Sequence, residues 1–522
     1  MRRVRTFFGI TGGAAVLFAA LVLTGGQPPR LAAGQAAGCD ASRSAVEFTG
    51  DGTIVSPSTA VVPCLTTTGY GGAETRVAVV PDGSTAGTVV YEPAVITPGL
   101  LGTGFGAGLP GPRPSTQVSP GGLAVSRDQG STWSFLEPAG QTWVPQDDQL
   151  YVDRTTGWLY YYALSPDPVP QSGTPLPSQL PAGYAQLMAS PDDGATWHHT
   201  ALPGYVESEN PRFTSAPAPA GRPAPVGYSA HPDVVYWCGN NALFTWTVNQ
   251  ITASAAGVQP VPSYRACYRS LDGGVTWAYA STLFSTPLAQ HSQCGTSGEN
   301  FSAGDGNYPQ GAPDGSLYVL VSCGSSTYLA RSTDEGATWP IMTSPGGGPL
   351  TVPDDGELRV DPAGNLYLVA QQGDALDLWT SVDQGLHWLG PQSMTVPGSS
   401  GIIQWFMAEA GVGEVAVSYL ADTASGVGYD GFLSVTQDAL ASSPLFYGTT
   451  LDDPASPVYA GTPPDARDDF IGVDIGPDGT PWASYFGSCA TADTDPGCAG
   501  QAGDPEANKS YVGRLTGLGP LP

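Results

Sequence analysis

The chain has 522 residues and a formal net charge of −28 at pH 7, because 18 Lys and Arg stand against 46 Asp and Glu. A surface this acidic repels phosphate backbones and anionic lipid, which disfavours nucleic-acid binding and membrane-surface binding. With 70 Gly, 50 Pro and 10% aromatic residues, the composition predicts an all-β chain that is rich in turns and long enough for a large core.

The first 38 residues are typical of a secretory signal followed by a linker of small residues. Arg2, Arg3 and Arg5 precede an apolar stretch, 7–23, and small residues and Pro continue to Gly38. We therefore expect a secreted, extracellular protein in which residues 39–522 form one domain, with no membrane insertion after signal removal. The apolar stretch is only just long enough to span a bilayer, so anchoring by an uncleaved N-terminal segment is the alternative.

All eight cysteines follow the signal segment, which fits an oxidising compartment. They fall in sequential neighbours, and the sequence has no Cys-x-x-Cys pair of the kind found in cytosolic metal or redox sites. We therefore predict four local disulfides, with the second pair on adjacent strands: Cys39–Cys64, Cys238–Cys267, Cys294–Cys323 and Cys489–Cys498.

A Ser-x-Asp-x-Gly-x-Thr-Trp pattern occurs five times, at 126–133, 190–197, 270–277, 332–339 and 381–388, where His387 replaces the Thr. Each copy predicts a tight turn, because the Asp accepts backbone N–H bonds, the Gly adopts a positive φ and the Trp packs on neighbours. Five copies indicate one repeated unit. We expect structural roles without chemistry for Asp128, Trp133, Asp192, Trp197, Asp272, Trp277, Asp334, Trp339, Asp383 and Trp388.

These turns resemble the Asp-box (BNR) repeats of the sialidase superfamily, and the resemblance covers most of residues 75–518. It implies a β-propeller in which each box joins the third and fourth strands of a blade. It implies much less about activity, because one fold carries many functions. Sialidases of known activity usually have six blades, so a six-bladed sialidase-type propeller is the alternative fold.

A second repeat predicts seven blades. A turn rich in Asp, Pro or Gly that feeds an apolar run of β-branched and aromatic residues is typical of a strand. Seven such segments occur, at 81–91, 153–162, 232–237, 313–321, 361–369, 411–419 and 477–485. The last blade offers only three late strands, so we expect the strand at 45–55 to complete it. The predicted fold is a monomeric, seven-bladed β-propeller of four-stranded blades.

Acidic residues recur near the predicted starts of the innermost strands, which open on one face of such a propeller. The predicted central face comprises Glu74, Arg76, Asp147, Asp148, Glu209, Arg212, Glu299, Asp354, Asp355, Trp405, Asp468 and Asp469. One interpretation is structural, because short polar side chains start strands well and hydrogen-bond between blades. The other makes the acids ligands for a cation, with calcium as the candidate, or catalytic carboxylates that raise each other's pKa.

The sequence lacks part of the sialidase catalytic set. That family places three arginines on the substrate carboxylate, the first in a Phe/Tyr-Arg-Ile-Pro stretch that is missing here. Sialic acid is an anion and would need a locally basic pocket, for which the candidates are Arg76, Arg212, Arg359 and Arg467. We predict recognition of an extracellular glycan or protein through an acidic central face. A glycoside hydrolase that uses carboxylates of that face is the alternative, and a purely structural or adhesion module is the third hypothesis.

Overall fold

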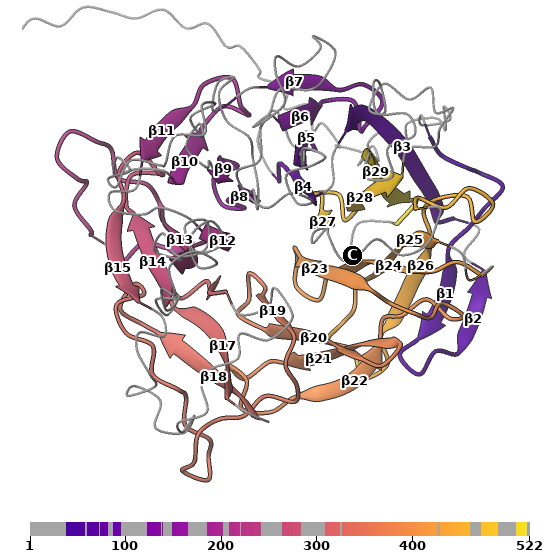
Figure 1. The fold of residues 1–522 in the computed structure, drawn as a ribbon. Coiled ribbons are helices and arrows are strands. Elements are labelled where there is room, and N and C mark those ends of the chain that lie inside the picture. Colours follow the sequence, from indigo (N-terminus) through magenta and orange to yellow (C-terminus); the bar gives the residue numbers. More distant parts are fainter. Residues whose placement is uncertain are drawn as a thin grey trace, which may run out of the picture. The chain divides into compact units, whose positions relative to one another are not determined.

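The computed structural model describes residues 38–57, 60–71, 74–81, 87–94, 123–136, 138, 149–164, 185–201, 208–219, 221–241, 264–282, 308–323, 326–424, 426, 428–459, 471–488 and 508–518. These residues form strands and turns without a helix, so no helix among them could span a membrane. All of them belong to one compact unit, Ala37–Pro522. Their seven antiparallel sheets form the blades of one propeller (Figure 1), which confirms the predicted seven-bladed fold.

Blades 1 to 3 follow one another along the chain, and their strands run in sequence order from the axis outward. Blade 1 contains β4 (Glu74–Val79), β5 (Val89–Ala94), β6 (Leu123–Ser126) and β7 (Ser134–Leu136). Blade 2 contains β8 (Gln149–Val152), β9 (Leu159–Leu164), β10 (Ala185–Ser190) and β11 (His198–Ala201). Blade 3 contains β12 (Ser208–Pro217), β13 (Asp233–Asn241), β14 (Tyr264–Ser270) and β15 (Ala278–Thr282).

Blade 4 has three regular strands, whereas blade 5 has four. Blade 4 contains β16 (Gln310–Gly311), β17 (Leu317–Cys323) and β18 (Ser326–Ser332). An irregular segment takes the outer position of this blade, where Ile341 bridges Ala330 and Thr351 bridges Tyr328. Blade 5 contains β19 (Glu357–Val360), β20 (Leu366–Gln372), β21 (Ala375–Ser381) and β22 (Leu389–Ser393).

Blades 6 and 7 both include strands from the N-terminal part of the chain. Blade 6 contains β23 (Gln404–Glu409), β24 (Val415–Asp422), β25 (Tyr429–Thr436) and β26 (Leu445–Thr450), extended outward by β1 (Val46–Thr49) and β2 (Ile54–Pro57). Blade 7 contains β27 (Gly472–Ile475), β28 (Pro481–Ser488), β29 (Asn508–Thr516) and, at its outer edge, β3 (Val62–Gly71).

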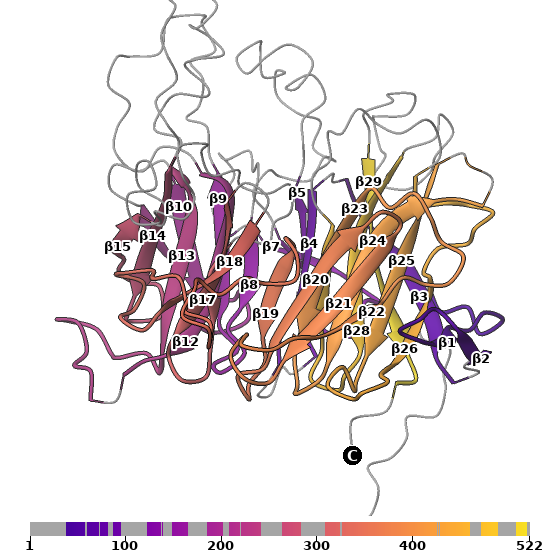
Figure 2. The ribbon, with the colours of Figure 1, turned by 90° about the horizontal axis from the view of Figure 1, so that it is seen from below.

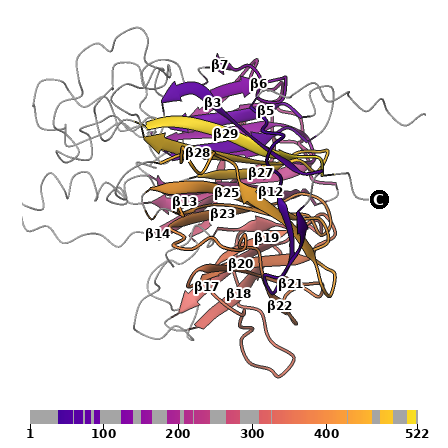
Figure 3. The ribbon, with the colours of Figure 1, turned by 90° about the vertical axis from the view of Figure 1, so that its right-hand side faces the viewer.

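An N-terminal strand closes the ring, but it is β3 and not the strand expected at 45–55. β3 pairs antiparallel with β29 and completes blade 7, and the two strands lie side by side in Figure 3. The predicted strand instead becomes the hairpin of β1 and β2, in which β1 pairs with β26 of blade 6. The physical reason is length, because the ten residues of β3 cover the nine-residue edge of β29 and the four residues of β1 do not.

The seven turn-and-strand segments read from the sequence become the second strands of the blades: β5, β9, β13, β17, β20, β24 and β28. Strand β20 shows why these runs are apolar throughout. Leu366 and Leu368 pack with residues of blade 4, whereas Tyr367 and Val369 pack with residues of blade 6. Because side chains alternate between the two faces of a strand, a strand held between two blades needs apolar residues at every position. The core therefore lies between neighbouring blades.

The repeated Ser-x-Asp-x-Gly-x-Thr-Trp turns follow the third strands of blades 1 to 5. In blade 3, Asp272 accepts hydrogen bonds from the Ser270 hydroxyl (2.8 Å), the Thr276 N–H (2.8 Å) and the Thr276 hydroxyl (2.7 Å). Gly274 has a φ of 90°, a region in which an L side chain is strained. In blade 5, His387 Nδ1 lies 2.6 Å from Asp383 Oδ2 and takes the place of the Thr hydroxyl.

Blade 6 contains a related turn that the sequence pattern does not reveal. The Thr436 hydroxyl donates to Asp438 at 2.8 Å, and the same carboxylate accepts the Leu445 N–H at 3.0 Å. Thr replaces Ser here, and the Gly and Trp of the pattern are missing. Asp438 therefore accepts a side-chain hydroxyl and a backbone N–H as the Asp of the pattern does, although the N–H lies seven residues later and not four.

Two of the four predicted disulfides lie within the described residues. Cys39–Cys64 ties the start of the described chain to β3, and Cys238–Cys267 joins the adjacent strands β13 and β14, as expected. The predicted pairs Cys294–Cys323 and Cys489–Cys498 involve residues outside the described part of the chain, so they stay predictions.

Candidate functional site

The innermost strands surround a cavity on the axis of the propeller. β4, β8, β12, β16, β19, β23 and β27 contact one another in turn around a closed ring, and Figure 2 shows the blades from the side. The cavity between them has a volume of about 340 Å³ and is lined by residues of all seven strands. This volume lies within the range of small-ligand sites.

The cavity concentrates the few cations of this acidic chain. Only 13 Arg follow residue 38, and four of them line this one cavity. The charged lining residues are Arg76, Asp153, Arg154, Arg212, Asp233, Arg359, Asp361, Glu409 and Asp474. Four positive and five negative groups thus face a shared space, and their arrangement decides what the site attracts.

The upper level of the cavity, which we define as Arg76, Arg212 and Phe406, brings together side chains of blades 1, 3 and 6. The guanidinium carbon of Arg76 lies 4.8 Å from the ring centroid of Phe406, and that of Arg212 lies 5.7 Å from it. Arg212 also lies 5.3 Å from the Tyr308 ring, and Arg76 donates to the Ile471 carbonyl at 3.1 Å. These cation–π contacts hold two positive charges at one wall.

The lower level of the cavity, which we define as the other seven charged lining residues, lies where the inner strands end and the second strands begin. Arg154 pairs with Asp474 at 2.5 Å and donates to the Ile475 carbonyl at 3.1 Å. Asp474 also accepts the Val79 N–H at 2.7 Å. This pair therefore clamps blades 7, 1 and 2 together at the axis.

A second clamp joins blades 5 and 6. Arg359 forms an ion pair with Glu357, and Glu357 accepts the Met407 N–H at 2.8 Å. Glu357 is 2% exposed, so its charge is held by these partners and not by water.

Glu409, the last residue of β23, lies close enough to the charged residues of both clamps for them to affect its pKa. Its removal from water raises its pKa to about 7, while the Arg154 and Arg359 guanidinium groups oppose this shift and Asp474 adds to it. Glu409 thus exchanges a proton near neutral pH. A carboxyl with this property inside a cavity is suited to act as a general acid.

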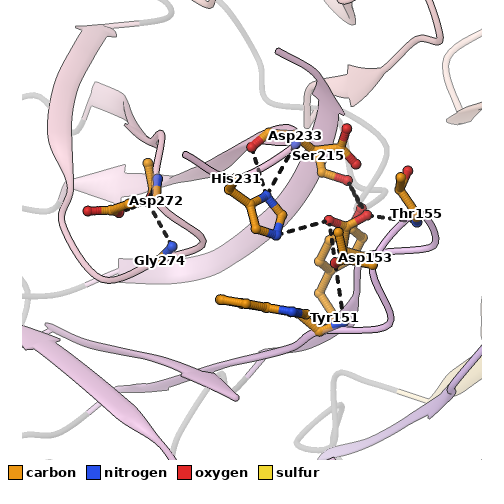
Figure 4. Close-up of polar contacts among 11 residues, drawn as sticks. Tyr151, Asp153, Thr155, Ser215, His231, Asp233, Asp272 and Gly274 are labelled. Atoms are coloured by element: carbon orange, nitrogen blue, oxygen red, sulfur yellow. Dashed lines mark hydrogen bonds and ion pairs between the residues drawn. The ribbon is translucent and has the colours of Figure 1, made fainter. Parts of the chain in front are cut away.

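Asp153 and Asp233 form a carboxyl pair between blades 2 and 3 (Figure 4). Asp153 has no exposed surface, and Asp233 is 3% exposed. Burial and, to a smaller extent, the nearby charge of Asp153 together raise the pKa of Asp233 to about 6. His231 Nε2 lies 3.9 Å from Asp153 Oδ2.

Two of the predicted central-face residues, Arg76 and Arg212, line the cavity, together with Arg359. Asp354 and Asp355 are not among the lining residues, and the Asp354 carboxylate accepts a hydrogen bond from Gln372. Trp405 is half-buried and packs into the core between blades 5 and 6. Glu74 and Glu209 lie in β4 and β12, and their side chains are outside the description. The other predicted residues lie outside the described part of the chain: Asp147, Asp148, Glu299, Asp468 and Asp469, as does Arg467.

Sequence analysis missed the acids that do line the cavity. Asp153, Asp233 and Asp361 belong to the turns that mark the second strands, so the turn alone explained them. Asp153 and Asp361 recur at the same position of blades 2 and 5, directly after the inner strand, and this recurrence is the signal that could have found them, because equivalent positions of a propeller meet at the axis. Glu409 and Asp474 lie within inner strands and carry no such signal.

A metal site receives no support from the described residues, which contain no group of three or more His, Cys, Asp or Glu suited to hold a metal ion. The expectation of calcium stays a prediction, because several of the acids on which it rests lie outside the described residues.

These features define the chain as a seven-bladed propeller with an axial cavity. Neither the family models nor the curated proteins contain a match to its sequence. Solved structures that resemble it include a Hadza microbial sialidase, with 15% identity over 73% of this chain and 66% of that chain and a TM-score of 0.37. The leech intramolecular trans-sialidase has 15% identity over 80% of this chain and 65% of that chain, with a TM-score of 0.34. An ulvan lyase has 11% identity over 80% of this chain and 93% of that chain, with a TM-score of 0.38. Likenesses at this level assign the chain to no family and carry over no activity.

Proposed function

We propose that this protein binds an anionic extracellular glycan in its central cavity. The observation that carries the proposal is the upper level, where Arg76 and Arg212 approach the same Phe406 ring. A guanidinium pairs with a carboxylate or sulfate through two parallel hydrogen bonds, and the low dielectric of a cavity strengthens the attraction. A cavity of about 340 Å³ admits a saccharide unit but not a flat protein surface, which favours a glycan over a protein.

The charge balance of the cavity supports an anionic ligand in acid. Asp233 and Glu409, whose pKa values are raised to about 6 and about 7, carry protons below those values. Two of the five acidic lining residues thereby lose their charge, while the four arginines keep theirs. The binding face that we propose is therefore the upper level of the cavity, with its two arginines, and not the acidic face expected from the sequence. An extracellular location is supported by the two disulfides.

Replacing Arg212 by Met tests the proposal. We expect Arg212→Met to weaken the binding of a uronate-containing, sulfated or sialylated oligosaccharide by at least about tenfold, or about 1.4 kcal/mol. Met keeps an unbranched apolar stem over Phe406 but removes the charge. Isothermal titration calorimetry at pH 5.5, with ligands first selected on a glycan array, measures the change.

The matched control is Arg269→Met, which removes an arginine from β14 that pairs with Glu335 at 2.9 Å and does not line the cavity. This variant should bind the same oligosaccharide as tightly as the unchanged protein. Equal binding of neutral and anionic oligosaccharides, or full affinity in Arg212→Met, would contradict an arginine-based anion site.

Glycoside hydrolysis is the second candidate, and Glu409 is the observation that favours it. A glycosidase needs one protonated carboxyl and one ionised carboxylate beside the scissile bond. Glu409 has a pKa raised to about 7, and Asp361 and Asp474 are its charged neighbours in the same cavity. One acid of the cavity therefore holds a proton up to near-neutral pH, with further carboxyl groups beside it.

If the protein is a hydrolase, Glu409→Gln should lower kcat by about a hundredfold or more, because the amide cannot donate a proton. Binding of the same oligosaccharide should change little. Release of reducing ends from the glycans that bind, followed over time at pH 5 to 8, provides the rate. Full activity in Glu409→Gln would exclude this residue as the acid, and no turnover in the unchanged protein would leave glycan binding as the function.

A further inference from the structure

The carboxyl pair of Asp153 and Asp233 joins two blades at the cavity wall, where Asp153 has no exposed surface and Asp233 is 3% exposed. Asp153 follows β8 of blade 2, and Asp233 opens β13 of blade 3. Besides burial, the charge and the hydrogen bonding of Asp153 both raise the pKa of Asp233, so the two carboxyl groups lie close enough to interact. A carboxylate only accepts hydrogen bonds, so the contact is attractive while one of the two groups holds a proton.

The donors around Asp153 make it the acceptor of the pair. Its Oδ1 accepts the Thr155 N–H at 2.9 Å and the Ser215 hydroxyl at 3.3 Å, and its Oδ2 accepts the Thr156 hydroxyl at 2.9 Å. Burial and then the charge of Asp153 raise the pKa of Asp233, against a smaller opposing hydrogen bond from the Thr155 side chain, so Asp233 is the member that carries the proton.

The same network reaches the cavity wall (Figure 4). The Tyr151 and Ser215 hydroxyl oxygens lie 2.7 Å apart, and both residues line the cavity. Tyr151 belongs to β8 of blade 2 and Ser215 to β12 of blade 3, so this contact crosses the same blade boundary.

Other charged and titratable groups lie near Asp153 and Asp233, and most of them have partners of their own. His231 Nδ1 lies 3.2 Å from the Asp233 nitrogen and 2.9 Å from its carbonyl oxygen, while Nε2 faces Asp153. Arg154 is engaged with Asp474. The hydroxyl groups of Tyr151 and Tyr160, from β8 and β9, and the carboxylate of Asp272, held in its turn, complete the surroundings.

We propose that Asp153, Asp233 and His231 form a proton-dependent latch between blades 2 and 3, which is closed in acid and loosens as the pH rises. Loss of the proton leaves two adjacent, buried carboxylates, and their repulsion separates β8 from β12 at the cavity wall. The latch does not depend on which ligand the cavity binds, so it stands or falls separately from the proposed function.

The direction of the effect follows from proton linkage. The pKa of Asp233 is raised from 3.8 to about 6 in the closed latch, so the closed form binds the proton more tightly. Its stability is fully present below pH 3.8 and is lost as the pH rises to about 6. Within that window the opening equilibrium should grow about tenfold per pH unit.

Hydrogen exchange followed by mass spectrometry on the unchanged, ligand-free protein tests this. After correction for the intrinsic exchange rate, peptides that contain β8 and β12 should exchange at least about tenfold faster at pH 6.5 than at pH 4.5. Peptides that contain β20 of blade 5 should show a smaller change. Equal changes in β8, β12 and β20 would overturn the latch without any variant being needed.

The decisive variant is Asp233→Asn, because the amide donates permanently to Asp153 and mimics the protonated acid. In this variant the excess pH dependence of β8 and β12 should disappear. Asp361→Asn is the control, since Asp361 holds in blade 5 the position that Asp153 holds in blade 2 and accepts from the Ala363 N–H and the Tyr367 hydroxyl. It should leave the pH dependence of β8 and β12 unchanged. Persistence of that dependence in Asp233→Asn would overturn the proposal.

Discussion

A variant that starts at residue 72, and so lacks β3, should fail to form a cooperatively folded propeller. β3 pairs with β29 over the length of blade 7, and its loss opens the ring and exposes an unpaired edge. We expect a loss of more than about 5 kcal/mol, which is comparable with the whole stability of many domains. Thermal unfolding followed by near-ultraviolet circular dichroism should show no sharp transition.

A variant that starts at residue 58 is the matched comparison, because it removes β1 and β2 but keeps β3. It should fold with a lowered thermal midpoint, since β1 only extends the outer edge of blade 6. Cys39→Ser in the full chain measures how much of that lowering comes from the lost Cys39–Cys64 disulfide. A sharp transition in the variant that starts at residue 72 would show that β3 does not close the ring.

The free energy of unfolding should fall by at least about 2 kcal/mol as the pH rises from 5 to 8. Three carboxyls, of which Asp233 and Asp452 are buried and Glu409 is half-buried in the cavity wall, bind protons more tightly in the folded chain, with pKa values raised to about 6, about 8 and about 7 respectively. Each removes about 1.4 kcal/mol of stability per pH unit between its unfolded and folded pKa. Urea unfolding at a series of pH values measures the slope.

Asp452 has the highest pKa of the three, and a substitution of its neighbour Asp430 tests its contribution. Burial is the largest cause of the raised pKa of Asp452, and the charge of Asp430 is the next. The Val458 and Gly431 N–H groups, which donate to the Asp452 carboxylate at 2.8 and 3.0 Å, oppose this shift. Asp430→Asn removes the opposing charge, so it should flatten the fall in stability between pH 6 and 8. An unchanged slope in that variant would mean that the pair does not titrate in this range.

Groups of the opposite kind limit stability at low pH. The Thr132 hydroxyl bond lowers the pKa of Asp128 from 3.8, so the stability from that turn is present above pH 3.8 and is lost as the pH falls further. We therefore expect the stability optimum near pH 4 to 5, between the two kinds of carboxyl.

The blade count and the second strands could be predicted because each propeller repeat depends on contacts between residues that are close in the sequence. Asp272 and Gly274 act within one turn, so their pattern is visible without any knowledge of partners. The choice between β1 and β3 for ring closure could not be made in this way. It depends on which N-terminal strand matches an edge formed more than 400 residues later, and both candidates look alike locally.

The cavity residues were harder to predict for a related reason. Arg76 and Arg212 were found because arginines are rare in this chain and both lie in inner strands. Asp153 and Asp233 were assigned to turns, and their turn role is real, yet burial and the charge of Asp153 also raise the pKa of Asp233. Glu409 resembles any strand-terminal acid, and its pKa depends first on burial and then on arginines brought in from blades 2 and 5.

The pairing of β3 with β29 sets the order in which this protein can mature. Thr68 of β3 and Ser510 of β29 contact each other across 442 residues, so β3 cannot pair with β29 until nearly the whole chain has been synthesised. During that interval its backbone donors and acceptors are open to wrong partners. Folding should therefore be slow for its size and sensitive to chaperones or crowding.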